Sequence, residues 1–208
     1  MTDNDGYSPP VAFIVTGFGP FGNAQENPTT VICNRLMDYR EDTTLASRTK
    51  TRVIETSAQA ARAELDAIEL PDSTTTVLLH LGVNYKGCHF QLEQCAYNDA
   101  TFRIPDEQGY QPRNVCIVDH IPLNMCMKTL LNIKDLCANA SDVVVSTDPG
   151  RFVCNYTYFY SLNKTQALDR VHSLFLHVPP FSVIPEETQM SVVVKLMQCI
   201  DLQLSNAS

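Results

Sequence analysis

Hydrophobic and polar positions form alternating blocks along the chain, and these blocks predict strands and helices in turn. Short apolar runs rich in Val, Ile, Leu and Phe are typical of buried strands, and apolar residues at helical spacing are typical of helices. The predicted strands are residues 11–17, 51–56, 74–83, 142–147 and 174–178. The predicted helices are residues 28–38, 58–70, 123–139, 152–162 and 186–203. This alternation indicates an α/β fold, a single-domain three-layer α/β/α sandwich around a mostly parallel twisted sheet.

Capping residues and turn residues refine these boundaries. Asn27 followed by Pro28 is a favourable N-cap and first-turn pair, and Ser57 is a favourable N-cap for the alanine-rich helix that follows it. Residues 84–121 are rich in Gly, Pro and Asn, and a segment of that length predicts a functional region rather than a plain connection. We expect residues 1–10 to form a flexible tail and residues 11–208 to form one domain.

Composition narrows the class of protein. A net charge of −8 argues against a nucleic-acid partner, and no apolar run is long enough to span a bilayer. The first ten residues are polar and acidic, unlike a signal peptide. The eight cysteines are irregularly spaced, without a CxxC pair or a zinc-ligand spacing, which favours reduced thiols. We therefore expect a cytoplasmic protein without a metal or cofactor, and the sequence leaves open whether it is a monomer or a homo-oligomer.

Cys154 is the most informative candidate for chemistry. It follows the strand-like run 142–147 and the turn residues Asp148, Pro149 and Gly150, so it lies in the first turn of the next predicted helix. Unpaired backbone N–H groups and the helix dipole favour an anion at that position, as a thiolate nucleophile requires. The alternative is a buried structural cysteine, since free cysteines are commonly buried.

A nucleophilic thiol needs a base, and His177 is the best placed histidine. It ends an apolar strand that two prolines terminate, at the sheet edge where α/β folds place their chemistry. The alternative is a histidine satisfied within the core. Glu93, which follows an apolar run and a glycine-bearing loop, is the best carboxylate to orient the imidazole.

Four separated segments give the chain a resemblance to the pyroglutamyl-peptidase I family of cysteine peptidases, which remove an N-terminal 5-oxoproline from peptides. The matching segments are VTGFGPFG with NPT (15–29), FQLEQCAYNDATFRIPDEQGYQP (90–112), STDPGRFVCNY (146–156) and FLHVP (175–179). They occur in the family's order and together span most of the chain. The combination is specific, although no single segment is.

The resemblance implies roles for seven residues and an omega-peptidase activity on pyroglutamyl peptides through a thioester acyl-enzyme. The family's catalytic triad falls on Glu93, Cys154 and His177, and its oxyanion-hole arginine falls on Arg103. The two phenylalanines that flank the pyroglutamyl ring in the family correspond to Phe18 and Phe21. The family's loop asparagine corresponds to Asn27. Two positions depart from the pattern, with Gln94 in place of a basic residue and Pro149 in place of an alanine. Neither change removes a catalytic group.

One motif favours a different class of protein. Residues 17–22, GFGPFG, fit the G-x-G-x-x-G dinucleotide fingerprint directly after a strand. That fingerprint requires a helix opening on the pyrophosphate, whereas here the helix is predicted to begin only at Pro28. A nucleotide-binding oxidoreductase and a catalytically silent binding protein on the same scaffold are the alternatives. A glycine-hinged loop that presents two aromatic rings to a neutral lactam fits this segment better.

Overall fold

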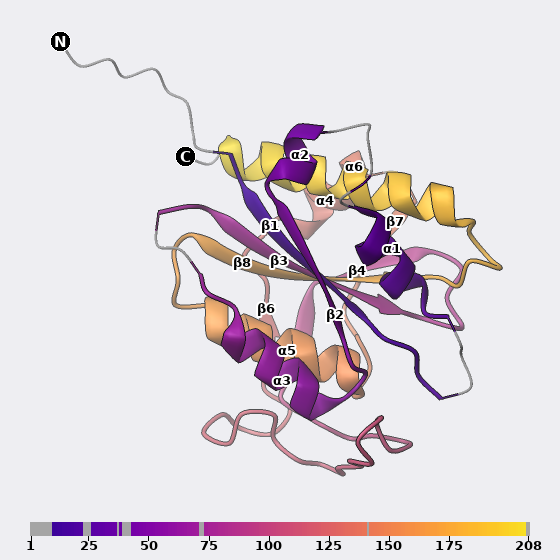
Figure 1. Ribbon diagram of the computed structural model, residues 1–208. Helices are drawn as coiled ribbons and strands as arrows, with labels where there is room; N and C mark the ends of the chain where they lie inside the picture. The colour runs from indigo at the N-terminus through magenta and orange to yellow at the C-terminus, as the bar shows by residue number, and fades with distance from the viewer. Residues whose placement is uncertain are drawn as a thin grey trace.

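A six-stranded mixed sheet forms the centre of the protein in the computed structural model, which describes residues 10–22, 26–36, 38, 43–70, 73–140 and 142–206 (Figure 1). The strands lie in the order β2 (Thr49–Ile54), β1 (Ala12–Phe18), β3 (Thr76–Val83), β8 (Val171–Val178), β4 (Phe90–Glu93) and β7 (Val143–Ser146). All neighbouring pairs are parallel except β4 with β8. The predicted α/β architecture with a mostly parallel sheet is confirmed.

Helices cover both faces of the sheet, which gives three layers. One face carries α1 (Pro28–Leu36), α2 (Thr43–Ser47), α4 (Ile133–Asn139) and α6 (Glu186–Ser205). The other face carries α3 (Ala58–Ala67) and α5 (Val153–Thr165). Among the described residues, no helix combines the length and the apolar composition that crossing a membrane requires.

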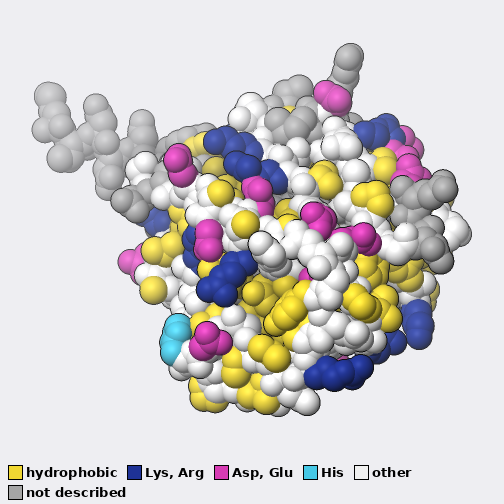
Figure 2. Space-filling view, turned by 60° about the horizontal axis from the view of Figure 1, so that its bottom comes forward, with side chains coloured by type: hydrophobic (Ala, Val, Ile, Leu, Met, Phe, Trp, Pro, Cys, Tyr) yellow, Lys and Arg dark blue, Asp and Glu magenta, His cyan; other side chains and the backbone are white. Residues whose placement is uncertain are grey.

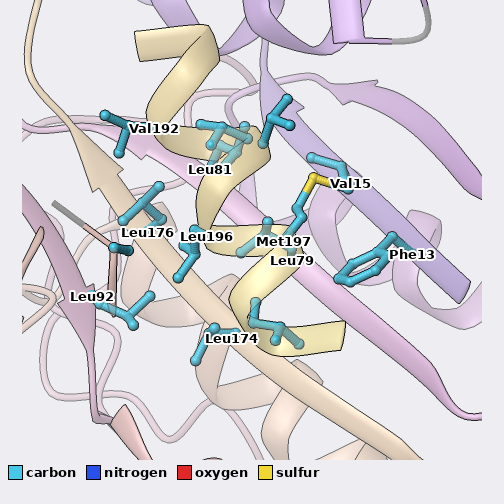
Figure 3. Packing of buried hydrophobic residues seen from close by; sticks show 14 of the residues in the cluster. Phe13, Val15, Leu79, Leu81, Leu92, Leu174, Leu176, Val192, Leu196 and Met197 are labelled. Atoms are coloured by element: carbon cyan, nitrogen blue, oxygen red, sulfur yellow. The ribbon is translucent and has the colours of Figure 1, made fainter. Parts of the chain in front are cut away.

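Alternate residues of the central strands fill the core beneath α1 and α6 (Figure 3). Leu79 and Leu81 of β3 and Leu174 and Leu176 of β8 point toward this face, where they pack against α6. Because side chains alternate along a strand, the intervening residues of β3 and β8 point toward α5. Both faces of these strands are buried, and this explains why their sequences read as continuous apolar runs.

The local capping predictions are confirmed. Helix α1 begins at Pro28, and Asn27 Oδ1 accepts a hydrogen bond from Thr29 N at 3.0 Å. Helix α3 begins at Ala58, and Ser57 Oγ accepts from Ala60 N at 3.1 Å. The predicted tail, residues 1–10, lies outside the described residues apart from Pro10.

The helix predicted over residues 123–139 is wrong in its first half. Residues 126–128 form strand β6 (Cys126–Lys128), which pairs antiparallel with β5 (Cys95–Tyr97), and α4 begins only at Ile133. Asn124 has a positive φ of 62°, and its N–H bonds to the Asn98 carbonyl at 3.1 Å. Hydrogen bonds to a distant segment override the local helical preference here. The short helix α2 was not predicted.

Residues 94–132 form a long connection that lies over α5 and contains the small β5–β6 sheet. Residues 84–121, predicted to be a functional region, include β4, β5 and much of this connection. This connection exposes apolar side chains, and the face that Figure 2 brings forward shows apolar side chains between scattered charged ones. The exposed apolar residues of the connection are Ile104, Tyr110, Val115, Leu123, Met125 and Leu130.

Candidate active site

Cys154 is the second residue of α5, in the first turn of that helix as predicted. The chain reaches it from β7 through a turn in which Gly150 has a φ of +78°, a conformation that glycine adopts without strain. No described side chain caps the start of α5. The backbone N–H groups of its first turn are therefore available to stabilise negative charge on a reacting group.

The sulfur of Cys154 lies against the backbone of β3 at Gly82. A Cβ placed on Gly82 would be 2.9 Å from Cys154 Sγ and 2.7 Å from the Phe175 ring. Only glycine leaves room for this approach. Gly82 is also the residue that pairs with His177 across β3 and β8, so the thiol and the imidazole meet over adjacent strands.

Glu93 and His177 are brought together by the one antiparallel pairing of the main sheet. In that pairing Gln91 lies opposite His177 and Glu93 lies opposite Phe175, so Glu93 and His177 are diagonal neighbours on one face. His177 Nδ1 lies 2.8 Å from Glu93 Oε1. A carboxylate can only accept, so Nδ1 carries the proton of this hydrogen bond and Nε2 is left for Cys154.

Burial and hydrogen bonding act in opposite directions on His177. Burial lowers its pKa, but hydrogen bonds to Cys154 and Glu93 and the charges of both groups outweigh burial and raise the pKa to about 9. Glu93 is 1% exposed and its Oε2 has no hydrogen-bond partner among the described residues, whereas its Oε1 bonds to His177. The site therefore favours an imidazolium between two acidic partners at neutral pH.

A pocket of about 710 Å³ opens beside the thiol. Every residue to which the resemblance assigned a role lines it: Phe18, Phe21, Asn27, Glu93, Arg103, Cys154 and His177. They come from β1 and the loop after it, β4, the long connection, α5 and β8. The sequence could propose these residues one by one, and the tertiary structure brings them to one cavity.

Aromatic rings form one side of this pocket. The Phe21 ring lies 5.2 Å from Phe152, and Phe152 lies 4.7 Å from Phe102, centroid to centroid. Sequence reasoning did not single out Phe152. The sequence feature that could have identified Phe152 is its position, two residues before Cys154 in the turn that leads to the thiol.

Asn27 shapes the loop that follows Phe18 and carries Phe21. Its Nδ2 donates to the Gly19 carbonyl at 2.9 Å, while its Oδ1 accepts from both the backbone and the hydroxyl of Thr29. The first glycine of the GFGPFG motif has a packing role, because a Cβ on Gly17 would lie 2.5 Å from the Thr29 carbonyl oxygen. Helix α1 therefore packs directly on β1, and the motif lacks the helix start that a dinucleotide requires.

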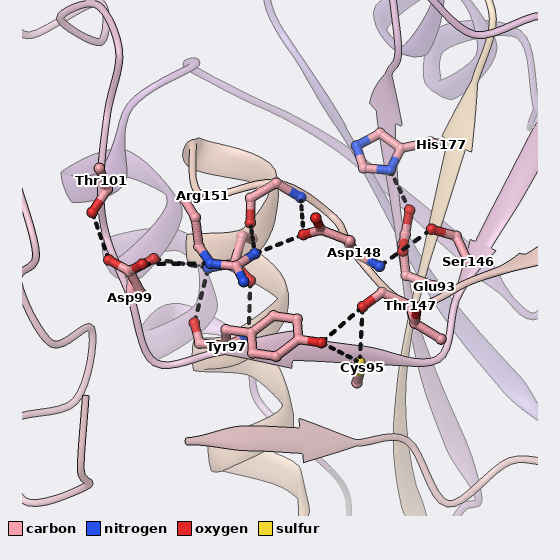
Figure 4. A network of polar contacts seen from close by, with 12 residues as sticks. Glu93, Cys95, Tyr97, Asp99, Thr101, Ser146, Thr147, Asp148, Arg151 and His177 are labelled. Carbon is pink, nitrogen blue, oxygen red and sulfur yellow. Dashed lines mark hydrogen bonds and ion pairs between the residues drawn. The ribbon is translucent and has the colours of Figure 1, made fainter. Parts of the chain in front are cut away.

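Arg103 lines the pocket from the long connection, and its guanidinium has no hydrogen bond or ion pair with the described residues. A second arginine, Arg151, lies in the turn before Cys154 and contacts Tyr97, Asp99 and Asp148 (Figure 4). Sequence reasoning missed this network. The sequence feature that could have indicated this network is the arginine of the STDPGRFVC segment. The sequence analysis treated that segment only as a turn.

His80 of β3 belongs to the core and not to a second site. His80 is fully buried between Thr16 and Ser161, at 2.8 Å from each, and burial lowers its pKa to about 3. It is therefore a neutral core histidine. Within the described residues, no group of three or more His, Cys, Asp or Glu side chains has an arrangement that could hold a metal ion.

Comparisons with known proteins show the family to which the chain belongs. The pyroglutamyl peptidase family model matches residues 11–200. Pyrrolidone-carboxylate peptidase of Thermococcus litoralis is 30% identical over 170 residues, which cover 80% of this chain and 75% of that protein. Pyroglutamyl-peptidase 1 of Rattus norvegicus is 28% identical over 180 residues, with 83% and 80% covered. The crystal structure of pyrrolidone carboxyl peptidase from Thermus thermophilus matches with a TM-score of 0.74 and 25% identity, over 89% of this chain and 98% of that one. The chain belongs to the pyroglutamyl peptidase family.

Proposed function

We propose that this protein is a cysteine peptidase that removes an N-terminal pyroglutamyl residue from peptides through a thioester acyl-enzyme. The observation that carries the proposal is the alignment of Cys154, His177 and Glu93 beside an aromatic pocket, in a chain of this family. A thiol that shares its proton with a carboxylate-oriented imidazole is the arrangement that nucleophilic catalysis by cysteine requires.

The reaction begins when His177 takes the proton of the Cys154 thiol, and the hydrogen bonds that raise the pKa of His177 make it a stronger base for this step. The sulfur attacks the carbonyl carbon that links the pyroglutamyl residue to the next residue, and the carbonyl oxygen becomes an oxyanion. The tetrahedral intermediate collapses, the C–N bond breaks, and His177 gives its proton to the leaving amine. Neutral His177 then takes a proton from water, which attacks the thioester and releases 5-oxoproline and the Cys154 thiol.

The oxyanion needs hydrogen-bond donors where its charge develops. The backbone N–H of Cys154, in the uncapped first turn of α5, is one proposed donor. Arg103 is the other, and the absence of a described partner for its guanidinium leaves it available to the substrate. Glu93 orients the imidazole through its 2.8 Å hydrogen bond and stabilises the imidazolium.

Phe18, Phe21 and Asn27 form the proposed specificity site. A five-membered lactam is flat and uncharged, so aromatic rings and a few polar partners suit it. The ordered contact between Phe21 and Phe152 fixes one of these rings before substrate arrives. A peptide with a free N-terminal amine would bring a charge into this pocket, where the desolvation of that charge is costly.

A cytoplasmic location and small peptide substrates belong to the same proposal. All eight cysteines are free thiols in the structure, which suits a reducing compartment. The net charge of −8 disfavours nucleic acid as a partner.

Hydrolysis of a fluorogenic pyroglutamyl amide by the purified chain tests the proposal. We expect turnover in the presence of a thiol reductant, and we expect none for Cys154→Ser, the matched control that keeps the size of the side chain. Tight binding of a dinucleotide without amide turnover would instead favour the oxidoreductase reading. A folded wild-type protein with no turnover and no dinucleotide binding would favour a silent binding protein.

A further inference from the structure

We propose that Arg151 is a positioning residue, which ties the turn carrying Cys154 to the segment following Glu93 and so fixes the nucleophile relative to its base. This inference rests on the proposed function of the site. Arg151 is three residues before Cys154, and the residues it contacts on the neighbouring segment are Tyr97, which ends β5, and Asp99 just after it.

The Arg151 guanidinium contacts two carboxylates and one aromatic ring (Figure 4). Its Nε lies 3.4 Å from Asp99 Oδ2, and its Nη1 lies 2.7 Å from Asp148 Oδ1. The plane lies over the Tyr97 ring, with Cζ 4.0 Å from the ring centroid. Asp148 belongs to the same turn as Arg151, whereas Tyr97 and Asp99 belong to the segment that continues from Glu93. The guanidinium thus joins two parts of the chain about 50 residues apart in sequence.

The partners of Arg151 are themselves held in place. Asp99 Oδ1 accepts a hydrogen bond from the Thr101 hydroxyl at 2.7 Å, so both oxygens of that carboxylate are directed. The Tyr97 hydroxyl donates to the Thr147 carbonyl at 3.0 Å, at the start of the same turn. A network in which each member is oriented by another resists displacement more than an isolated ion pair does.

The main chain adds a second set of contacts on either side of the nucleophile. Thr101 N donates to the Arg151 carbonyl at 3.1 Å. On the other side of Cys154, the Asn155 side chain accepts from Tyr97 N at 2.8 Å and donates to the Tyr97 carbonyl at 2.8 Å. Cys154 is therefore flanked by two residues that bind the same neighbouring segment.

Burial makes the Arg151 contacts effective. The side chains of Arg151 and Asp99 are 29% and 10% exposed, so solvent screens this pair less than a fully exposed ion pair. The planar fork of arginine serves two carboxylates while stacking on an aromatic ring, and a lysine cannot satisfy all three partners. The arrangement therefore depends on arginine rather than on positive charge alone.

The expected consequence is catalytic, because a displacement of about 1 Å at a reacting atom can cost about 10²-fold in rate. Loss of the Arg151 side chain removes the contacts with Tyr97 and Asp99 that orient this turn, while the main-chain contacts still hold it near the neighbouring segment. We expect the thiol to lose its alignment with His177. Arg151 also lines the pocket, but its side chain does not contact Phe18, Phe21 or Asn27, so we expect the lactam site to change less.

The test compares Arg151→Gln and Arg151→Lys with Arg52→Gln. Arg52 is a matched control because it pairs with Glu64 at 2.7 Å on the surface and does not line the pocket. We expect Arg151→Gln to lower kcat roughly 10- to 100-fold with KM changed less than about threefold, Arg151→Lys to lower kcat about tenfold, and Arg52→Gln to change neither by more than twofold.

A second measurement needs no substrate. The rate of alkylation of Cys154 by iodoacetamide is followed against pH, with peptide mapping to identify the modified residue. In the Arg151 variants we expect slower alkylation of Cys154 at neutral pH and therefore a changed profile, because the contact with His177 is weakened. A merely stabilising arginine would lower Tm without moving this profile.

A kcat within twofold of wild type in folded Arg151→Lys and Arg151→Gln, or an alkylation profile identical to wild type, would overturn the inference. If Arg151→Gln does not fold, Arg151→Lys carries both measurements. If the wild type hydrolyses no pyroglutamyl amide, the proposed function fails, yet the alkylation profile still decides the role of Arg151.

Discussion

A methyl group added at Gly82 tests the geometry of the site at its closest contact. In Gly82→Ala the new Cβ would lie 2.9 Å from Cys154 Sγ and 2.7 Å from Phe175 Cζ. Gly82 does not have a positive φ, so the substitution strains packing rather than the backbone. Its effect therefore reports on the space that the thiol occupies.

The structure sets the expected size of both effects. Phe175 is fully buried, so its ring cannot move freely, and overpacking of this kind costs about 1–3 kcal/mol of unfolding free energy. For a chain of this length that corresponds to a Tm lower by about 2 to 12 °C. To reach an ordinary contact of 3.4 Å from 2.9 Å, the Cys154 sulfur must move by about 0.5 Å. A shift of that size predicts a loss of about tenfold in kcat.

The assay is kcat and KM on a pyroglutamyl amide together with Tm by calorimetry. The double variant Gly82→Ala/Phe175→Leu, compared with Phe175→Leu alone, separates the two contacts. Removing the ring relieves the clash with Phe175 and should recover part of the Tm, while the contact with Cys154 persists and kcat stays low. A Gly82→Ala enzyme with wild-type kcat and Tm would refute the close approach of the thiol to β3.

The remaining predictions concern the three proposed catalytic groups and the pocket. The pKa of His177 is raised from 6.5 to about 9, so its contribution to stability is complete below pH 6.5 and is lost as the pH rises through 9. In denaturant titrations, the free energy of unfolding of the wild type should fall by about 3 kcal/mol relative to that of His177→Ala between pH 6 and pH 10. Glu93→Gln should fold and lower kcat by about tenfold to 10⁴-fold in steady-state kinetics, and full activity would show that Glu93 does not orient the base. One equivalent of iodoacetamide should modify Cys154 first and abolish turnover, and mapping that finds Cys154 intact after inactivation would exclude it as the nucleophile. By mass spectrometry, a pyroglutamyl peptide should be cleaved and the same peptide beginning with glutamine should not, whereas comparable rates would contradict the proposed pocket.

Local signals in the sequence were sufficient for the elements that local chemistry controls. The apolar runs of β1, β3 and β8 predicted buried strands, and Asn27 and Ser57 predicted two helix starts that the structure confirms. The turn residues before Cys154 placed that thiol in the first turn of α5. In each case the determining interactions lie within a few residues of one another, so the sequence contains the whole cause.

Local sequence signals did not predict the contacts between distant segments. Residues 123–132 read as part of a helix, but β6 and the bonds of Asn124 to Asn98 hold them in another form. The reversed direction of β4 places Glu93 beside His177, and no local pattern announces a reversal. Whether Gly82 gives room to the thiol, and whether Arg151 reaches Asp99, likewise depends on strand order and register. The sequence by itself determined which residues are the catalytic candidates and, for Cys154 and His177, which elements hold them. Only the tertiary structure decided how those residues meet, because non-local pairing fixes distances that local propensity does not contain.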